Sequence, residues 1–150
     1  MTLVKIVYAS STGNTEGISE HLEDAFEDLS CEVVREHADD VDEDFFEDAD
    51  IAVVATYTDG DGELPFDFED FHEEIMDQEF AGKIFGVVGT GDSELYPDYF
   101  CQAAFMFEEA LLKTGAVKGA NTVTIENEAE EEDVERIIAF AKALLEKHEA

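Results

Sequence analysis

Positive charge is scarce in this sequence. The 150 residues include 8 Lys and Arg against 40 Asp and Glu, which gives a formal net charge of −32. An excess of this size repels nucleic-acid phosphates and anionic lipid surfaces, so we exclude nucleic acid as a natural partner and expect no membrane insertion. A protein partner with a basic docking surface fits this charge instead.

The same charge favours salt adaptation. At the Debye length of about 10 Å in 0.1 M salt the carboxylates repel one another, whereas near 1 M salt the length is about 3 Å and the repulsion largely disappears. The acidic residues are spread over nearly every expected helix. We therefore predict a halophilic protein from a high-salt cytoplasm. The alternative is an acidic surface that steers docking in an ordinary cell.

Cysteine and long apolar runs are also few or missing. Cys31, in an expected strand, and Cys101, at an expected helix start, make no metal or redox motif by their spacing. No charged-then-apolar segment opens the chain, and no apolar run approaches the ~18 residues of a membrane helix. We expect a soluble cytoplasmic monomer. With 45% apolar residues and twelve Phe, residues 1–150 should form one domain.

What the chain does have is a regular alternation of two patterns. Apolar runs rich in β-branched residues predict strands, and segments with helical periodicity predict helices. The strands are expected at residues 3–7, 31–37, 50–55, 83–88 and 120–125, and the helices at 16–29, 66–76, 98–114 and 128–147, with a short additional helix from Asp42. This alternation predicts an α/β fold with a doubly wound five-stranded parallel sheet, in the order 2-1-3-4-5, and helices on both faces.

The first turn of this fold is dense in hydroxyl groups. Ser10, Ser11, Thr12 and Thr15 follow the first strand and open the first helix, and no Lys or Arg lies between Lys5 and Arg35. A helix start offers unpaired N–H groups and a partial positive charge, so it can hold a phosphate without a cation. The missing lysine argues against a P-loop and favours a terminal monophosphate. The alternative is a Ser/Thr-rich cap that serves only its own helix.

Two further loops follow the ends of strands. Residues 56–64 include Gly60 and Gly62, and residues 89–101 include Gly89 and Gly91. In doubly wound sheets ligands bind beyond the carboxyl ends of the strands, where the strand order reverses. Here that point lies between the strand ending at Tyr8 and the strand ending at Ala55, so we expect the three loops to converge on one pocket.

No catalytic or metal-binding set accompanies these loops. The four histidines fall on expected helices or strands, away from the loop ends, and are interpreted as surface residues: His21, His37, His72 and His148. No Ser-His-Asp arrangement and no metal site are therefore predicted. We expect a protein without catalytic side chains.

The three loops together resemble those of the flavodoxins, a likeness that covers the whole chain. The resemblance lies in Ser10-Ser11-Thr12-Gly13-Asn14-Thr15, in Gly60-Asp61-Gly62-Glu63-Leu64-Pro65, and in Gly89-Thr90-Gly91-Asp92 with Tyr96 and Phe100-Cys101. It implies a flavodoxin-like fold that holds one non-covalently bound FMN and shuttles single electrons between redox enzymes. The chain has the length of short-chain members and the tyrosine spacing of long-chain ones.

The resemblance also implies positions for the cofactor. The phosphate is expected at residues 10–15, Gly60 and Asp61 beside flavin N5, the backbone around Asp92 and Cys101 at the pyrimidine edge, and Tyr96 stacked on the ring. The complete predicted set is Ser10, Ser11, Thr12, Gly13, Asn14, Thr15, Tyr57, Thr58, Asp59, Gly60, Asp61, Thr90, Gly91, Asp92, Tyr96, Tyr99, Phe100 and Cys101.

One position departs from the family pattern. Many flavodoxins have Trp immediately before the residue equivalent to Gly60, on the inner face of the ring, and this chain has Asp59. Either Tyr57, Leu64 or Phe66 covers that face, or the face is more open. An ionised Asp59 at ~6 Å would oppose added negative charge by roughly 3 kcal/mol at a dielectric of 20. The alternative is that Asp59 points to solvent and does little.

Three other functions remain as alternatives to a low-potential electron carrier. They are an FMN-dependent oxidoreductase of the quinone-reductase type, an activator of a ribonucleotide reductase, and a flavin-free regulatory module. Quinone reductases of this fold usually have longer loops and an oligomer surface, which 150 residues scarcely provide. The missing inner aromatic residue keeps the flavin-free module open.

Overall fold

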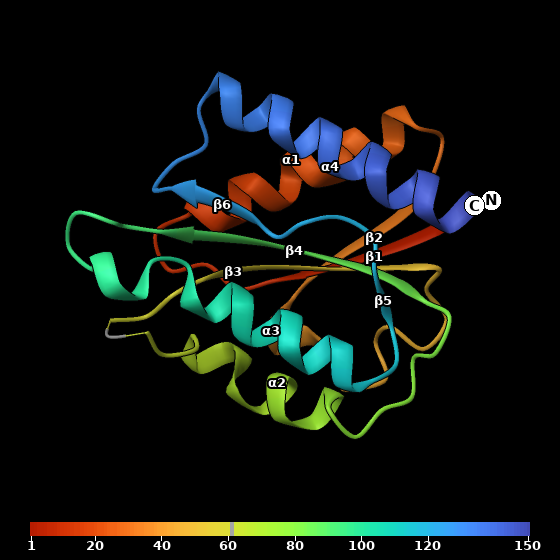
Figure 1. The fold of residues 1–150 in the computed structure, drawn as a ribbon, viewed down its shortest axis with the longest axis horizontal. Helices are drawn as coiled ribbons and strands as arrows, with labels where there is room; N and C mark the ends of the chain where they lie inside the picture. Colours follow the sequence, from red (N-terminus) through yellow and green to blue (C-terminus); the bar gives the residue numbers. More distant parts are fainter. Residues whose placement is uncertain (61) are drawn as a thin grey trace.

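The computed structural model describes residues 1–60 and 62–150 as an α/β sandwich around one parallel sheet (Figure 1). The strands lie in the order β2-β1-β3-β4-β5, and β6 also pairs with β4. Their bounds are β1 Leu3–Tyr8, β2 Glu32–His37, β3 Ile51–Tyr57, β4 Ile84–Gly91, β5 Val117–Lys118 and β6 Val123–Glu126. The predicted sheet order is confirmed.

Helices cover both faces of the sheet, as predicted. On one face α1 (Asn14–Asp28) and α4 (Glu131–Glu149) lie side by side, and the other face is covered by α2 (Glu69–Ile75) and α3 (Gln102–Lys113) (Figure 1). Two apolar cores result. Phe26 and Leu144 are fully buried in the first, and Phe68 and Phe107 are fully buried in the second.

The central strands are longer than the sequence predicted. β3 extends to Tyr57 and β4 to Gly91, so residues expected in loops are paired with neighbouring strands. Tyr57 lies opposite Thr90, and Thr90 also lies opposite Ile125 of β6. Gly89 permits this pairing beneath α3, because a Cβ atom there would lie 2.6 Å from the Cβ of Ala104. Pairing with a strand on each side therefore outweighs the tendency of Gly89 and Gly91 to end the strand.

Other boundaries also differ from the predictions. In place of one last strand there are two short ones, β5 and β6. Between them Gly119 lies close to α4, where a Cβ atom would lie 2.7 Å from Leu144 Cδ2. The helix predicted from about residue 98 begins only at Gln102, after a short 3-10 turn (Pro97–Tyr99). The short helix predicted from Asp42 is wrong. Residues 43–48 form successive turns instead. In a helix, the carboxylates of this segment would lie three or four residues apart on one face and would repel one another.

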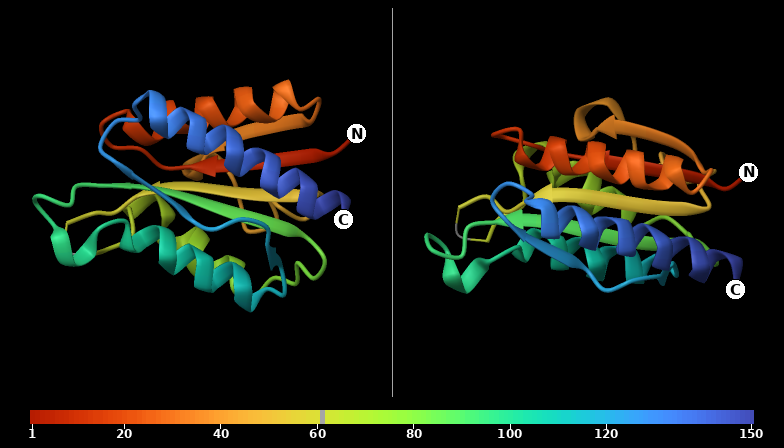
Figure 2. Two further views of the ribbon diagram at one scale, coloured as in Figure 1. Left: turned by 45° about the horizontal axis from the view of Figure 1, so that its top comes forward. Right: turned by 90° about the horizontal axis from the view of Figure 1, so that it is seen from above.

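The parallel arrangement brings the loops after β1, β3 and β4 to one end of the sheet (Figure 2). β1 and β3 are neighbours, with Tyr8 opposite Ala55, so the point where the strand order reverses lies where it was predicted. Within residues 1–60 and 62–150, no helix is long and apolar enough to cross a membrane.

Candidate functional site

A small cavity lies among the three loops at the carboxyl ends of the strands. Its volume is about 140 Å³, and it is lined by Ser11, Thr12, Thr15, Tyr57, Thr58, Thr90, Gly91, Asp92, Tyr96 and Asn127. All of these except Asn127 belong to the set predicted from the sequence. The structure therefore brings the three loops together as expected.

The first loop is shaped for an anion by its own backbone. Gly13 has a left-handed conformation (φ 96°) and forms the N-cap of α1, where it supplies no capping side chain. The first helical hydrogen bond runs from the Gly17 amide to the Gly13 carbonyl at 3.0 Å, so the amides of residues 14–16 precede the helical ladder. The alternative of a Ser/Thr helix cap is thereby disfavoured.

The hydroxyl groups of this loop have separate tasks. The Ser10 hydroxyl accepts a hydrogen bond from the Gly13 amide at 3.0 Å and so stabilises the turn. Ser11 and Thr12 are exposed at the cavity, whereas the buried Thr15 contacts the Thr90 hydroxyl at 3.1 Å. The loop thus combines free amides with at least two accessible hydroxyls, a donor set that fits a phosphate monoester.

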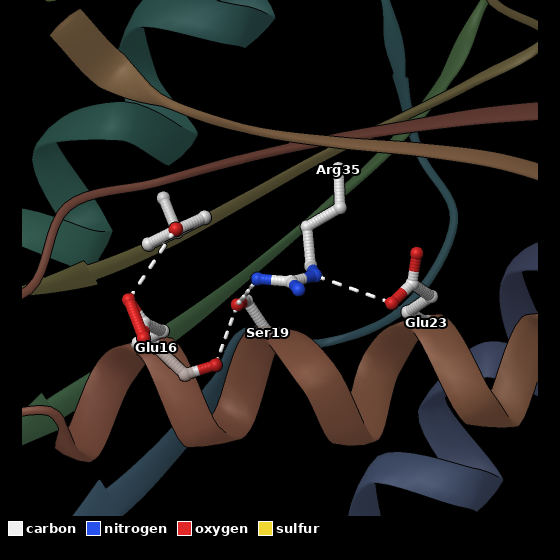
Figure 3. A network of polar contacts seen from close by, with 5 residues as sticks. Glu16, Ser19, Glu23 and Arg35 are labelled. Atoms are coloured by element: carbon white, nitrogen blue, oxygen red, sulfur yellow. Dashed lines mark hydrogen bonds and ion pairs between the residues drawn. The ribbon is translucent and has the colours of Figure 1, made fainter.

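A basic side chain near this loop is already engaged (Figure 3). Arg35 of β2 donates to Ser19 at 3.1 Å and to Glu23 at 3.3 Å, both on α1, and its guanidinium lies 5.4 Å from the centre of the Tyr8 ring. Tyr8 in turn donates to Glu16, 3.4 Å away. Burial raises the pKa of Tyr8, and Glu16 adds to this rise. The network ties α1 to β1 and β2, and it occupies Arg35 in doing so.

The second loop continues from β3 as a tight turn. Tyr57 and Thr58 line the cavity, and the Thr58 hydroxyl accepts a hydrogen bond from the Ala103 amide of α3 at 3.0 Å. Burial raises the pKa of Tyr57, with Asp59 as the next cause. Asp59 and Glu63 exchange backbone hydrogen bonds of 2.8 and 2.9 Å across the turn.

Two predicted residues at this turn do not join the cavity lining. Asp59 is exposed to solvent, and Gly60 bends the turn with a φ of 43°. Asp61, also predicted to contact the cofactor, lies outside the described residues. In this loop Tyr57 therefore faces the cavity, and Asp59 does not.

The third loop is held in shape by two carboxylates. Asp92 accepts hydrogen bonds from the amides of Glu94 and Leu95 at 3.0 and 3.1 Å. Glu126, at the end of β6, accepts hydrogen bonds from the amide and the hydroxyl of Ser93. Tyr96 follows this turn, lines the cavity and keeps 39% of its surface exposed. A broad aromatic ring is thus presented at the cavity mouth.

The second and third loops pack directly on each other. A Cβ atom on Gly62 would lie 2.7 Å from Tyr99 Cδ1 of the third loop. Within the third loop, a Cβ atom on Gly91 would lie 3.0 Å from both the Cys101 amide nitrogen and Phe100 Cδ1. Tyr99, Phe100 and Cys101 were predicted to contact the cofactor. In this structure Tyr99 contacts the second loop, Phe100 and Cys101 pack on Gly91 within the third loop, and none of the three lines the cavity.

Cys101 is the most buried of these three residues. It is fully buried, has a left-handed φ of 55° and precedes α3. Burial raises the pKa of its thiol to about 12. A thiol that stays protonated at neutral pH is a poor nucleophile, so Cys101 has a packing role here.

Sequence reasoning missed Asn127. This residue follows β6 with a left-handed φ of 50°, its amide donates to the Gly91 carbonyl at 2.9 Å, and it lines the cavity. A usable signal existed, because Asn tolerates the left-handed region and Asn127 follows the carboxyl end of a fourth strand. The loop after β6 therefore belongs with the three other loops that follow the carboxyl ends of strands.

One group of side chains has the composition of a metal site. His37, Asp39 and Asp67 bring potential ligand atoms within 4.8 Å of one another. However, His37 Nδ1 accepts the Asp39 amide at 3.0 Å, so a neutral ring has its proton on Nε2, which faces Asp67 at 3.7 Å. Neither nitrogen keeps a free lone pair, and the arrangement does not fit a metal ion.

His37 also corrects the interpretation of the histidines. It is the last residue of β2, at the carboxyl edge of the sheet, and it is half-buried with its ring edge-on to Tyr8 at 5.3 Å. His72 is likewise half-buried, and its ring contacts the Met106 carbonyl at 3.2 Å. The sequence had predicted that both are surface residues, and the structure shows both half-buried.

A larger groove elsewhere is unsuited to an anion. It has a volume of about 830 Å³ and lies between β2, β1 and the connection to β3. Its lining is Lys5, Val34, Val41 and Phe45 with six carboxylates, Glu36, Asp40, Asp42, Asp44, Glu47 and Asp48. Lys5 is already paired with Asp48 at 2.7 Å. We therefore place the functional site by its chemistry and not by its size.

The arrangement of fold and loops agrees with known proteins. The family model described as flavodoxin matches residues 6–140. Probable flavodoxin 2 of Bacillus subtilis (strain 168) is 34% identical over 148 residues, which are 98% of this chain and 97% of the relative. These matches run along almost the whole chain, and they do not favour a reductase, an activator or a flavin-free module.

Solved structures give the same result. The flavodoxin of Streptococcus pneumoniae TIGR4 is 47% identical with a TM-score of 0.93, over 97% of this chain and 99% of that one. Oxidised Flavodoxin 2 from Bacillus cereus is 37% identical with a TM-score of 0.91, over the same shares of the two chains. The chain belongs to the flavodoxin family, whose members are FMN-binding electron carriers and not enzymes.

Proposed function

We propose that the turn of residues 10–15 holds the phosphate of FMN in this chain. The observation that supports this most directly is the turn itself, with Gly13 capping α1 and the amides of residues 14–16 ahead of the helical ladder. Ser11, Thr12 and Thr15 add hydroxyl donors on the cavity side. The phosphate is bound without a basic side chain in the loop.

The flavin ring is placed between the second and third loops. Tyr96 provides the outer aromatic face and Tyr57 the inner one, since both line the cavity while Asp59 is exposed and Phe66 keeps 80% of its surface in solvent. The cavity of about 140 Å³ is below the ~300 Å³ of typical ligand pockets. We therefore expect the two loops to separate when the ring enters.

The flavin supplies one-electron chemistry when bound, and the chain supplies position and electrostatics. Gly60 has a φ of 43°, and a glycine at this turn can adopt conformations closed to other residues. Carboxylates around the loops oppose the addition of negative charge, which favours a low potential. No side chain of the chain is given a catalytic role.

The decisive experiment compares FMN with riboflavin, which lacks the phosphate. Flavin-free protein in 2 M KCl is titrated with each compound, and binding is followed by the quenching of flavin fluorescence. We expect FMN to bind at least 100-fold more tightly than riboflavin. Equal affinities would contradict the phosphate position, and no uptake of either compound would contradict the whole assignment.

The redox partner is proposed to dock at the loop end of the molecule. Two apolar side chains are strongly exposed there, Phe66 at 80% and Leu95 at 70%, beside the exposed carboxylates Glu63, Glu94 and Asp98. Apolar anchors within an acidic rim suit a partner with a basic surface. We also expect the chain to be cytoplasmic, and to be monomeric, since a net charge of −32 opposes self-association. Partner reduction rates should fall steeply between 0.1 and 0.5 M KCl.

Salt adaptation is tested separately by thermal melting of the holoprotein. If screening stabilises the acidic surface, the melting temperature should rise from 0.1 M to 2 M KCl. A flat or falling melting temperature would discard the halophilic interpretation and leave partner steering as the reason for the acidic surface.

A further inference from the structure

The β2 edge of the sheet has no strand partner. β2 pairs with β1 alone, so within residues 1–60 and 62–150 no strand lies along its outer edge (Figure 2). The Glu32 amide is directed towards β1 and donates to the Thr2 carbonyl at 2.9 Å. Backbone groups alternate in direction along a strand, so the amides of Val33 and Arg35 point to the outer edge. Backbone groups of this kind can pair with an added strand.

The groove of about 830 Å³ lies along this strand, on the sheet face opposite α1. Arg35 points to α1 (Figure 3), so its neighbours Val34 and Glu36 point to the other face and line the groove. Val34, Val41 and Phe45 are half-buried there, and in the part of the chain that the structure describes Val34 belongs to neither apolar core. We call this hollow the edge groove, and its lining consists of Lys5, Val34, Glu36, Asp40, Val41, Asp42, Asp44, Phe45, Glu47 and Asp48.

The charge of the edge groove indicates what kind of partner it fits. Six of its ten lining residues are exposed carboxylates, whereas the cavity among the three loops is lined by one, Asp92. Lys5 is the only base in the lining, and it is paired with Asp48. The other five carboxylates take part in none of the ion pairs of residues 1–60 and 62–150. The edge groove therefore attracts a cationic surface and repels a second copy of itself.

We propose that the edge groove binds an extended, lysine- or arginine-rich segment of a partner protein, which lies beside β2 as an added strand. Main-chain hydrogen bonds to Val33 and Arg35 hold the segment, and its side chains enter the groove at alternate positions. Lysine and arginine fit because their apolar stems cover Val34 and Phe45 while their charged ends reach the carboxylates. The edge groove shares no lining residue with the cavity among the three loops, so the segment tethers its partner and leaves the loop end free.

The test uses a seven-residue peptide that alternates Lys with Thr, and a control peptide that has the same residues in two blocks. Each is titrated into the FMN-loaded chain in 0.3 M KCl, and calorimetry gives the dissociation constants. The alternating peptide should bind about 5-fold more tightly or better, because only its lysines all face the groove.

Hydrogen exchange of the backbone amides, followed by NMR, locates the bound peptide. Exchange at Val33 and Arg35 should slow about 10-fold or more, because these amides become paired. The amides of Val34 and Glu36 lie on the β1 side of the same strand and are the internal control. Their exchange should change by about 2-fold or less.

Two double variants with the same change in net charge complete the design. Asp40→Asn with Asp44→Asn removes two carboxylates of the edge groove and should weaken binding of the alternating peptide about 10-fold or more. Glu135→Gln with Glu146→Gln removes two exposed carboxylates of α4, outside the groove, and should weaken it about 2-fold or less.

Three results would overturn the proposal. Equal affinities for the two peptides, or equal weakening in the two double variants, would reduce the interaction to a general attraction between a polyanion and cations. Unchanged exchange at Val33 and Arg35 would exclude an added strand beside β2, and so would the absence of peptide binding. The FMN affinity of both double variants should match that of the unmodified chain, so a failure here leaves the phosphate position untouched.

Discussion

The two halves of the cofactor site are built in different ways. The turn of the first loop is local, because the hydrogen bonds that shape it run from Gly13 to Ser10 and from Gly17 to Gly13, and only the Thr15 hydroxyl at its end contacts a distant strand, at Thr90. The ring loops depend on distant parts of the chain. Ala103 of α3 donates to Thr58, and Ser93 donates to Glu126. A phosphate cradle is thus a property of one turn, while a ring pocket is a property of the packed fold.

This difference suggests different responses to mutation. A change in the first loop should alter the affinity for the phosphate and leave the fold intact, since the turn contacts few other elements. A change where the ring loops touch should alter stability as well, because the same atoms hold β3, β4 and α3 together. The following predictions test this contrast.

The largest effect is expected from a negative charge in the first loop. Thr12→Asp places a carboxylate among the donors for the phosphate. Two unit charges 4 Å apart repel by about 4 kcal/mol at an effective dielectric of 20, or roughly 1000-fold in affinity. FMN titration by fluorescence measures the loss. Riboflavin affinity should change by less than about 3-fold, and an equal loss for both ligands would contradict the locality of this loop.

The next effect concerns the contact between the ring loops. Gly62→Ala adds a methyl group 2.7 Å from Tyr99 Cδ1, at a φ of 89° that disfavours any Cβ. We expect flavin-free protein to lose about 1–3 kcal/mol of unfolding free energy, measured by urea denaturation in 2 M KCl. FMN affinity should fall as well, since Tyr99 must move.

The matched control is the same substitution at Gly17. This glycine lies inside α1, outside the left-handed region, and an added Cβ meets no atom within 4 Å. Gly17→Ala should therefore stabilise the chain by about 0.4–1 kcal/mol. If both substitutions changed stability equally, the loop contact would have no special role.

Features that depend on consecutive residues could be predicted from the sequence, whereas features that depend on contacts between distant residues could not. The position of the first loop could be predicted, because a strand, a hydroxyl-rich turn and a helix start are consecutive, and three of its six predicted residues line the cavity, while their contact with the phosphate stays a prediction. The sheet order followed from the alternation of patterns. The extension of β4 to Gly91 was missed, because pairing with β3 and β6 overrides two glycines. Asn127 was missed although it follows the carboxyl end of a strand, and its hydrogen bond to the Gly91 carbonyl could be seen only in the folded chain.

A further effect on the unfolding free energy is expected at alkaline pH, from the Cys101 thiol at the end of the third loop. The Cys101 thiol has a pKa of about 12 in the folded chain, against about 8.5 unfolded. A raised pKa stabilises the fold fully below pH 8.5, and the contribution is lost as pH rises towards 12, because the unfolded thiol ionises first. From pH 9 to 11 this loss should be on the order of 2–3 kcal/mol.

The measurement compares two cysteine variants of the flavin-free chain. Cys101→Ala should show a flatter decline of unfolding free energy between pH 9 and 11 than the unmodified chain. Cys31→Ala should keep most of the decline. The pKa of Cys31 is also raised by burial, but this residue lies before β2 and outside the site. An unchanged slope in Cys101→Ala would contradict a buried, neutral thiol at the loop contact.

The smallest effect is expected at Asp59, the residue that stands where many flavodoxins have Trp. Its side chain is exposed, while Tyr57 lines the cavity from the same loop. A carboxylate in solvent is strongly screened, so Asp59→Asn should shift the second one-electron potential by less than about 10 mV, against 59 mV for a tenfold change in equilibrium constant. Tyr57→Ala should shift it further and weaken FMN binding. A shift above about 30 mV in Asp59→Asn would instead place the carboxylate beside the ring and assign it the inner face.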